Sequence, residues 1–154
     1  MRKILPILLI VAATSPAGAV QSTSATSERP LATPVNDPSL RWGPCPPIFP
    51  AGCQITVLHG DPARPNADIW LRVPAGYEIP PHRHSSAERM ILVTGQLRVR
   101  YQGSPPATLF QGSYAYGPAG LPHVASCLGD QPCTLFIAFE GPVDAEPFTG
   151  SLDP

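Results

Sequence analysis

The chain has 154 residues, which is enough for one domain with a hydrophobic core and too few for two. Its ten basic and eleven acidic residues nearly balance, and no basic run follows the first few residues, which argues against a nucleic-acid partner. Twenty-two prolines and thirteen glycines leave no dozen residues with a helical period, so the sequence predicts short strands.

The N-terminus has the pattern of a signal peptide, predicted over residues 1–19. Arg2 and Lys3 precede an apolar stretch over 4–13, and small residues at 17–19 offer a cleavage site after Ala19. An uncleaved membrane anchor is the weaker alternative, because a span needs roughly twenty apolar residues. We therefore expect a periplasmic or secreted protein without a transmembrane anchor after processing.

Processing changes the charge of the chain. With Arg2 and Lys3 removed, eight basic residues remain against eleven acidic ones, a net charge of −3. All eight are arginines, so the mature chain has no lysine and cannot form a lysine Schiff base.

The mature chain reads as a linker, one domain and a tail. Residues 20–39 are rich in Pro, Ser and Thr and lack periodicity, which predicts a flexible tether. The domain is predicted over 40–141, followed by a C-terminal tail over 142–154. Short apolar or alternating runs predict strands at 54–59, 67–73, 88–94, 96–101, 107–110, 113–116, 123–127 and 133–139.

Strands of this length and spacing predict an all-β fold, a sandwich or barrel of the jelly-roll type. Gly95 separates two of them as a tight hairpin connection.

Four cysteines fit an exported protein and permit three connectivities. They form two close pairs, and each pair brackets a turn rich in Pro or Gly. We expect the local disulfides Cys45–Cys53 and Cys127–Cys133. A cysteine-rich zinc site is poorly supported because no CxxC spacing occurs.

Two motifs carry the chemistry. Residues 76–95 read GYEIPPHRHSSAERMILVTG, and residues 112–123 read GSYAYGPAGLPH. Along a strand alternate side chains share a face, so His82 and His84 project the same way and Arg83 projects outward. Glu78 is also expected to face outward. Glu88 and His123 can supply the third and fourth ligands of a metal site. His59 is off this pattern and is expected to have no role.

These residues resemble the two motifs of the cupin superfamily, over residues 54–139. In that family the first motif is G-x5-H-x-H-x3/4-E-x6-G, and the second is G-x5-P-x-G-x2-H-x3-N. Every fixed position of the first is matched. The second departs only at Cys127, where asparagine is usual. The matching residues are Gly76, His82, His84, Glu88, Gly95, Gly112, Pro118, Gly120 and His123.

The resemblance implies a small barrel with His82, His84, Glu88 and His123 around one divalent metal in its interior. Three imidazoles and a carboxylate suit a first-row transition ion: Fe, Mn, Ni, Cu, Co or Zn. Four protein ligands leave positions for water, dioxygen or substrate. We expect Cys127 to form its disulfide and not to bind the metal.

The cavity wall is predicted from strand parity. Met90 and Leu92 share the face of Glu88 if the strand is regular. Aromatic residues on neighbouring strands are further candidates for the substrate pocket: Trp70, Tyr114, Tyr116 and Phe136.

The expected function is a metal-dependent enzyme of dioxygenase type acting on a small organic molecule, with Glu88 as a catalytic base. The alternative is a non-catalytic module that binds a small ligand or metal for sensing or storage, since no further acid or base is evident. A sugar-phosphate or nucleotide-sugar isomerase ranks last: it needs inward cationic residues, for which Arg72, Arg98 and Arg100 are candidates. Dimers are common among similar barrels, so a homodimer is a candidate assembly for this chain.

Overall fold

The chain divides into two compact units, Met1–Ala32 and Thr33–Pro154. A computed structural model describes residues 29–153, and its strands all belong to the second unit. Residues 29–32, the described part of the first unit, are exposed and have no regular secondary structure. The predicted signal peptide and the first part of the predicted linker, up to residue 28, lie outside the described residues.

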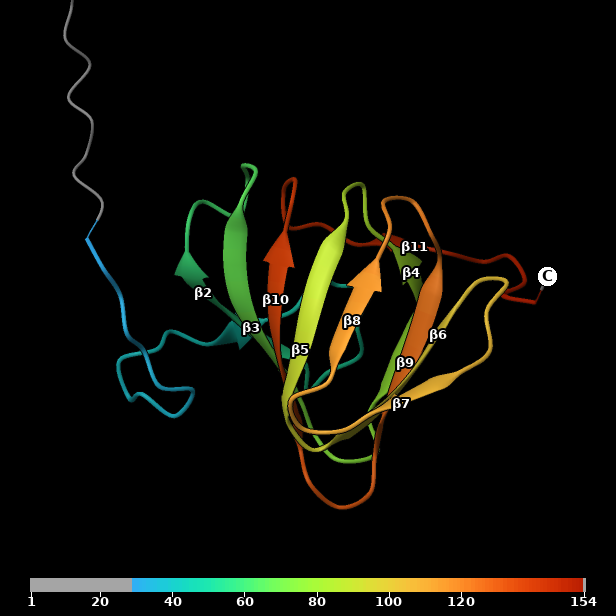
Figure 1. The fold of residues 1–154 in the computed structure, drawn as a ribbon, viewed down its shortest axis with the longest axis horizontal. Coiled ribbons are helices and arrows are strands. Elements are labelled where there is room, and N and C mark those ends of the chain that lie inside the picture. Colours follow the sequence, from blue (N-terminus) through green and yellow to red (C-terminus); the bar gives the residue numbers. More distant parts are fainter. Residues whose placement is uncertain (1–28, 154) are drawn as a thin grey trace, which may run out of the picture. The chain divides into compact units, whose positions relative to one another are not determined.

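Two antiparallel sheets build the second unit, and the described residues contain no helix (Figure 1). The six-stranded sheet has the order β1-β2-β3-β10-β5-β8, and the five-stranded sheet has the order β11-β4-β9-β6-β7. The strands of the first are β1 (Gly43–Pro44), β2 (Gln54–His59), β3 (Ala67–Val73), β10 (Cys133–Phe139), β5 (Glu88–Thr94) and β8 (Tyr114–Gly117). Those of the second are β11 (Glu146–Pro147), β4 (Glu78–Arg83), β9 (His123–Leu128), β6 (Gln96–Tyr101) and β7 (Ala107–Leu109).

The all-β jelly-roll prediction is confirmed, and all eight predicted strands are present with ends shifted by at most one residue. Strand β4 was not predicted as an element of its own. Its sequence, EIPPHR, contains Pro80 and Pro81, which have no N–H to donate to a ladder. The pairing with β9 is accordingly irregular between Ile79 and His82.

The core lies between the two sheets and follows the period of two expected for strands. In β10, Leu135 and Ile137 are buried at 2% and 4% exposure, whereas Phe136 between them is only partly buried. Leu97 and Val99 of β6 are buried in the same way from the other sheet. Burial of each such side chain contributes about 2 kcal/mol.

The structure pairs the cysteines as predicted, Cys45 with Cys53 and Cys127 with Cys133. Gly95 connects β5 to β6 with φ of +82°. A Cβ at this position would lie 2.7 Å from the Pro132 carbonyl oxygen and 2.9 Å from Cys133 Sγ. Both the turn and the second disulfide therefore require glycine here.

The segment predicted as a C-terminal tail returns to the five-stranded sheet. Its strand β11 pairs with β4, and Leu152 is 7% exposed. Leu152 also accepts a backbone hydrogen bond from Gly103 at 3.1 Å, and Asp153 forms an ion pair with Arg100 at 2.8 Å. Since the described residues form no helix, they contain no helix that could span a membrane.

Candidate metal centre

His82 lies near the end of β4, and His84 is the first residue after the strand. Strand parity turns both imidazoles inward, with 4% and 7% exposure, and turns Arg83 out to an ion pair with Glu146 at 2.9 Å. The prediction that the two histidines share a face is therefore confirmed.

His123 and Glu88 reach the same place from other strands. His123 begins β9, where it pairs in register with His82 of β4. Glu88 begins β5 in the opposite sheet and is 2% exposed. The closure of the two sheets over one core thus brings together residues that are up to 41 positions apart in the sequence, from His82 to His123.

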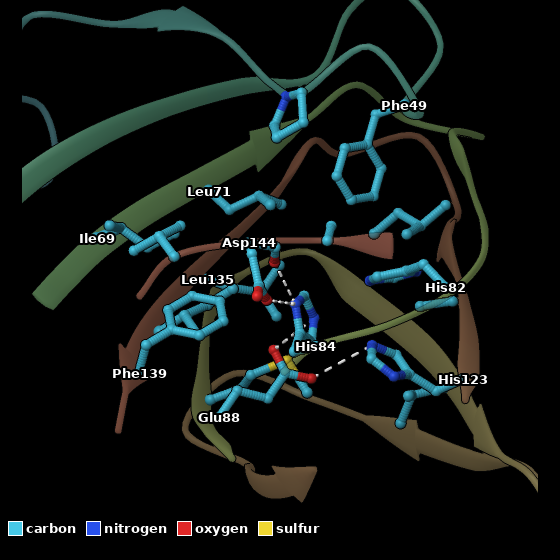
Figure 2. A pocket seen from close by; sticks show the side chains of 18 of the residues that line it. Phe49, Ile69, Leu71, His82, His84, Glu88, His123, Leu135, Phe139 and Asp144 are labelled. Atoms are coloured by element: carbon cyan, nitrogen blue, oxygen red, sulfur yellow. Dashed lines mark hydrogen bonds and ion pairs between the residues drawn. The ribbon is translucent and has the colours of Figure 1, made fainter. Parts of the chain in front are cut away.

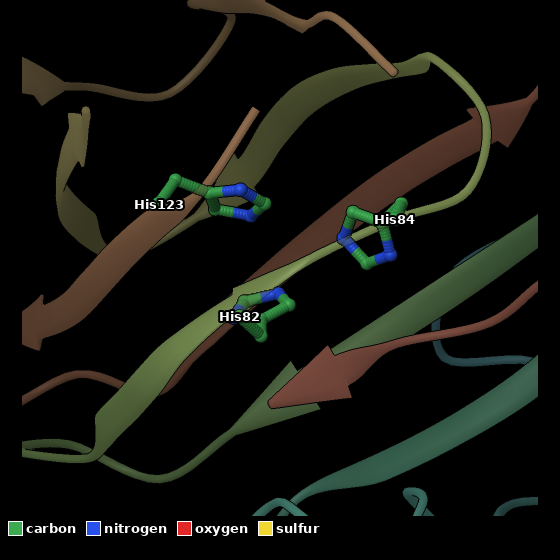
Figure 3. A group of neighbouring side chains, drawn as sticks. All are labelled: His82, His84 and His123. Atoms are coloured by element: carbon green, nitrogen blue, oxygen red, sulfur yellow. The ribbon is translucent and has the colours of Figure 1, made fainter. Parts of the chain in front are cut away.

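The three imidazoles form one cluster (Figure 3). One nitrogen of each ring lies within 4.8 Å of the other two. The ring centroids of His82 and His123 are 4.2 Å apart, and those of His82 and His84 are 4.9 Å apart. Such a spacing lets a single first-row cation bind all three rings.

Backbone carbonyl groups orient each ring. Nδ1 of His82 lies 2.7 Å from the Pro80 oxygen, and Nδ1 of His84 lies 2.5 Å from the Asp144 oxygen. Nδ1 of His123 lies 3.4 Å from the Leu121 oxygen. A carbonyl oxygen only accepts, so Nδ1 carries the proton and Nε2 of a neutral ring keeps its lone pair for a metal.

Glu88 faces two of these lone pairs. Its Oε2 lies 3.4 Å from His84 Nε2, and its Oε1 lies 3.2 Å from His123 Nε2. Oε1 is buried without a hydrogen-bond partner among the described residues. Acceptors that face one another need a proton or a cation between them.

The pKa values of these groups show that burial without a bound cation disfavours the charged form of each one. Burial raises the pKa of Glu88 from 4.5 to about 8. Burial, followed by the neighbouring His84, lowers the pKa of His82 from 6.5 to about 4. Burial also lowers the pKa of His84 and of His123. Neutral imidazoles beside a carboxylate fit a divalent transition ion, and the residues present therefore fit the predicted cofactor.

The cluster lies in a cavity of about 50 Å³ between the sheets (Figure 2). By this measure the cavity has room for an ion with a few waters or a small ligand. Its polar lining consists of the three histidines, Glu88 and Asp144, and the rest is apolar. The apolar lining residues are Pro46, Phe49, Ile69, Leu71, Ile79, Met90, Leu97, Val99, Ala125, Leu135, Ile137, Phe139, Val143 and Ala145.

Met90 lines the cavity as predicted, but Leu92 does not: it is fully buried in the core and does not contact the cavity. The prediction that Trp70 and Phe136 wall the cavity is wrong. Their chain neighbours line it, so strand parity turns these two rings to the outer face, where they pack edge to face at 5.6 Å.

The same correction applies to Tyr114 and Tyr116 on the edge strand β8. They are 59% and 47% exposed and point away from the cavity. His59 is exposed and lies outside the cluster.

The arginines considered for an anionic substrate also lie outside the cavity. Arg72 donates to Gln54 Oε1 at 2.7 Å and lies 4.2 Å from the ring centroid of Trp42. Arg100 pairs with Asp153, and Arg98 is exposed.

Two functional positions were missed by the sequence analysis. Asp144 orients His84 through its backbone oxygen, which leaves no residue-type signal, and it lies beyond the predicted end of the domain. Phe49 lies in the turn between Cys45 and Cys53, with its ring centroid 5.1 Å from that of His82. The spacing of the two cysteines predicted the turn, but it did not predict that the Phe49 ring points toward His82.

Two antiparallel sheets enclosing a three-histidine cluster define a cupin. The chain belongs to the ChrR cupin-like domain family, which matches residues 33–144.

One curated relative is the dimethylsulfoniopropionate lyase DddQ of Ruegeria pomeroyi, 29% identical over 97 residues. The match covers 62% of this chain and 48% of the relative, so the chain spans about half the length of that protein. A crystal structure of DddQ from Ruegeria pomeroyi has a TM-score of 0.58 at 23% identity, covering 71% of this chain and 60% of that one. A structure from work on the dimethylsulfoniopropionate lyases RdDddP and RnDddQII has a TM-score of 0.62 at 18% identity, covering 71% and 63%. These structural likenesses support the fold.

Proposed function

We propose that this protein is an exported metal-dependent enzyme that converts a small organic molecule, in an oxygen-dependent reaction of the dioxygenase type. The observation that carries the proposal is that one nitrogen of each of three imidazoles converges in one cavity with Oε1 of Glu88, which has no hydrogen-bond partner in the described part of the chain. A purely structural site would surround its ion with protein ligands on all sides. Here the cluster faces a cavity with an apolar lining, which leaves room for a substrate.

Different residues of the cavity have different proposed roles. His82, His84 and His123 hold the ion, with their rings oriented by three backbone carbonyls. When bound, the ion supplies Lewis acidity or activation of dioxygen. The apolar wall keeps bulk water from the substrate.

Glu88 is proposed as a fourth ligand and as the catalytic base. Its Oε1 has no donor among the described residues, so this oxygen is available to accept a proton from a substrate. The carboxylate is 2% exposed, so such a proton would be shielded from water.

A lyase is the second candidate, and the similarity to a dimethylsulfoniopropionate lyase favours it. Elimination from such a substrate needs one base, a role for which Glu88 is placed. No observation favours the isomerase of anionic sugars, because no arginine lines the cavity.

The test begins with the metal content of purified mature protein by inductively coupled plasma mass spectrometry. Oxygen uptake is then measured with catechol-type, flavonol and keto-acid compounds, and release of dimethyl sulfide is measured with dimethylsulfoniopropionate. Oxygen uptake supports the dioxygenase, and dimethyl sulfide without oxygen uptake supports the lyase. One ion per chain without turnover in either assay favours the non-catalytic binding module.

The two disulfides indicate an oxidising compartment. Export to the periplasm or the medium remains a proposal. Fractionation of cells that express the full chain, with N-terminal sequencing of the product, tests both this location and cleavage after Ala19.

A further inference from the structure

The cavity is bordered at one end by the segment 45–53, here named the roof loop. It leaves β1, turns through PPIFPAG, and closes with the Cys45–Cys53 disulfide before β2. Two of its residues, Pro46 and Phe49, line the cavity. In Figure 2 the Phe49 ring lies beside His82.

Several independent contacts fix this loop. Besides the disulfide, the Cys45 N–H donates to the Cys53 oxygen at 3.2 Å, and the Phe49 N–H donates to the Pro46 oxygen at 3.0 Å. The Tyr77 hydroxyl donates to the Pro50 oxygen at 2.5 Å. A side chain carried by a loop so tied has little freedom to move away from the site.

The Phe49 ring makes a specific contact with a predicted ligand. It meets His82 edge to face, with an interplanar angle of 81°. The ring is partly buried, although it belongs to a short loop rich in Pro. Packing against the cluster therefore orders Phe49, and the sequence analysis gave it no role.

We propose that Phe49 is a specificity-determining residue, which limits the size of the molecule that reaches the metal ligands and requires an apolar group beside His82. This inference rests on the proposed function, because it takes the cavity as the substrate site. The ligand class is a small molecule with a metal-binding atom and a compact apolar part. The roof loop disfavours bulky molecules, and the lack of Lys or Arg in the lining disfavours polyanionic ones.

Two azoles test the roof without knowledge of the substrate. Imidazole and 4-phenylimidazole bind cobalt through the same ring nitrogen and differ by one phenyl group. The protein is loaded with Co²⁺, and dissociation constants for both azoles are obtained from visible absorption spectra. The readout is the ratio of the two constants for each variant.

Phe49→Ala should improve binding of 4-phenylimidazole relative to imidazole by about tenfold or more, because the phenyl group gains the volume of the lost ring. Phe49→Trp should shift the ratio in the opposite direction and keeps the test valid if the alanine variant fails to fold. Phe110→Ala is the matched control, since Phe110 is 59% exposed and outside the cavity.

Equal ratios for the wild type, both Phe49 variants and the control would overturn the proposal that Phe49 limits the size of the ligand. Such a result would leave the proposed metal site unaffected. Failure of the wild type itself to bind cobalt would overturn the proposed function, and the roof with it. The two failures are thus distinguishable in one experiment.

Discussion

The inward and outward sides of the six-stranded sheet are both rich in large apolar residues, but only the inward side encloses the cavity. Inward, Leu135 and Met90 are 2% and 5% exposed and enclose the cavity. Outward, Ile91 and Tyr114 are 40% and 59% exposed. Register places Phe136 opposite Ile91, and Ile91 opposite Tyr114, in one row across the outer face.

The comparison shows that apolar character does not tell the two sides of this sheet apart. The sequence of β10 is almost continuously apolar, but neighbouring residues on the strand point to opposite sides of the sheet. Every second residue therefore faces the cavity, and the residues between them face outward. Depth of burial and the presence of polar partners separate the sides. Substitutions at buried positions, each compared with a substitution at an exposed position, test this separation directly.

The largest effect is expected at the inward histidines. His82→Ala or His123→Ala should lower metal affinity by about a hundredfold or more, since a lost ligand leaves only part of the donor set. His59→Ala, an exposed histidine, is the control and should keep full occupancy. Metal content by mass spectrometry and circular dichroism of the fold measure this. Full occupancy in His82→Ala would mean that the ligand assignment is wrong.

Next in size is the loss of packing. Leu135→Ala should lower the free energy of unfolding by about 3 kcal/mol, because it leaves a cavity in the core. Tyr114→Ala on the outer face should change it by about 0.5 kcal/mol or less. Urea unfolding of both variants gives the two values. Similar losses at the two positions would erase the distinction between the sides.

A glycine beside the site should have a smaller effect on stability. A Cβ on Gly117 would lie 2.8 Å from Glu88 Oε1 and 3.2 Å from Tyr101 Cε1. Gly117→Ala should therefore cost about 1–3 kcal/mol and weaken metal binding by displacing the carboxylate. Gly43→Ala is the control, because its Cβ would meet nothing within 4 Å. Thermal unfolding and metal titration compare them, and equal behaviour would show that Glu88 tolerates movement.

A separate prediction concerns the pH dependence of the stability of the metal-free protein. The pKa of Glu88 is raised to about 8 in the folded state, so the folded protein retains a proton that the unfolded chain releases. This contribution to stability falls as pH rises from about 4.5 to about 8, by about 1.4 kcal/mol per pH unit at most.

The histidines act in the opposite direction. The pKa of His82 is lowered to about 4, so its contribution falls as pH drops from 6.5 toward 4. Burial also lowers the pKa of His84 and of His123, so the three histidines together outweigh Glu88 below pH 6.5, and metal-free protein should be most stable near that pH. Glu88→Gln should remove the decline above that pH, as measured by urea unfolding from pH 4 to 9. A decline that persists in this variant would assign it to another group.

Much of the site could be predicted because its signals are local. The one-residue gap between His82 and His84 places them on one face in any strand, whatever the rest of the fold does. The disulfides follow from cysteines that are 8 and 6 residues apart. The motif spacing also identified Glu88 and His123 without any knowledge of the register between β4 and β9.

Other features could not be predicted because they depend on contacts over long distances in the sequence. Packing against the second sheet decides which side of β3 and of β10 faces inward, so Trp70 of β3 and Phe136 of β10 were assigned to the wrong side. The support of His84 comes from Asp144, 60 residues away, whose backbone oxygen lies 2.5 Å and whose carboxylate lies 3.8 Å from the His84 Nδ1 atom.

The amino-acid sequence by itself determined the alternation of the strands, the metal-binding residue types and the cysteine pairs, because each depends on neighbours along the chain. Only the tertiary structure decided which apolar side chains enclose the cavity and that Phe49 and Asp144 border it. Those choices arise when two sheets close on each other, since burial and hydrogen bonding then select one face of each strand.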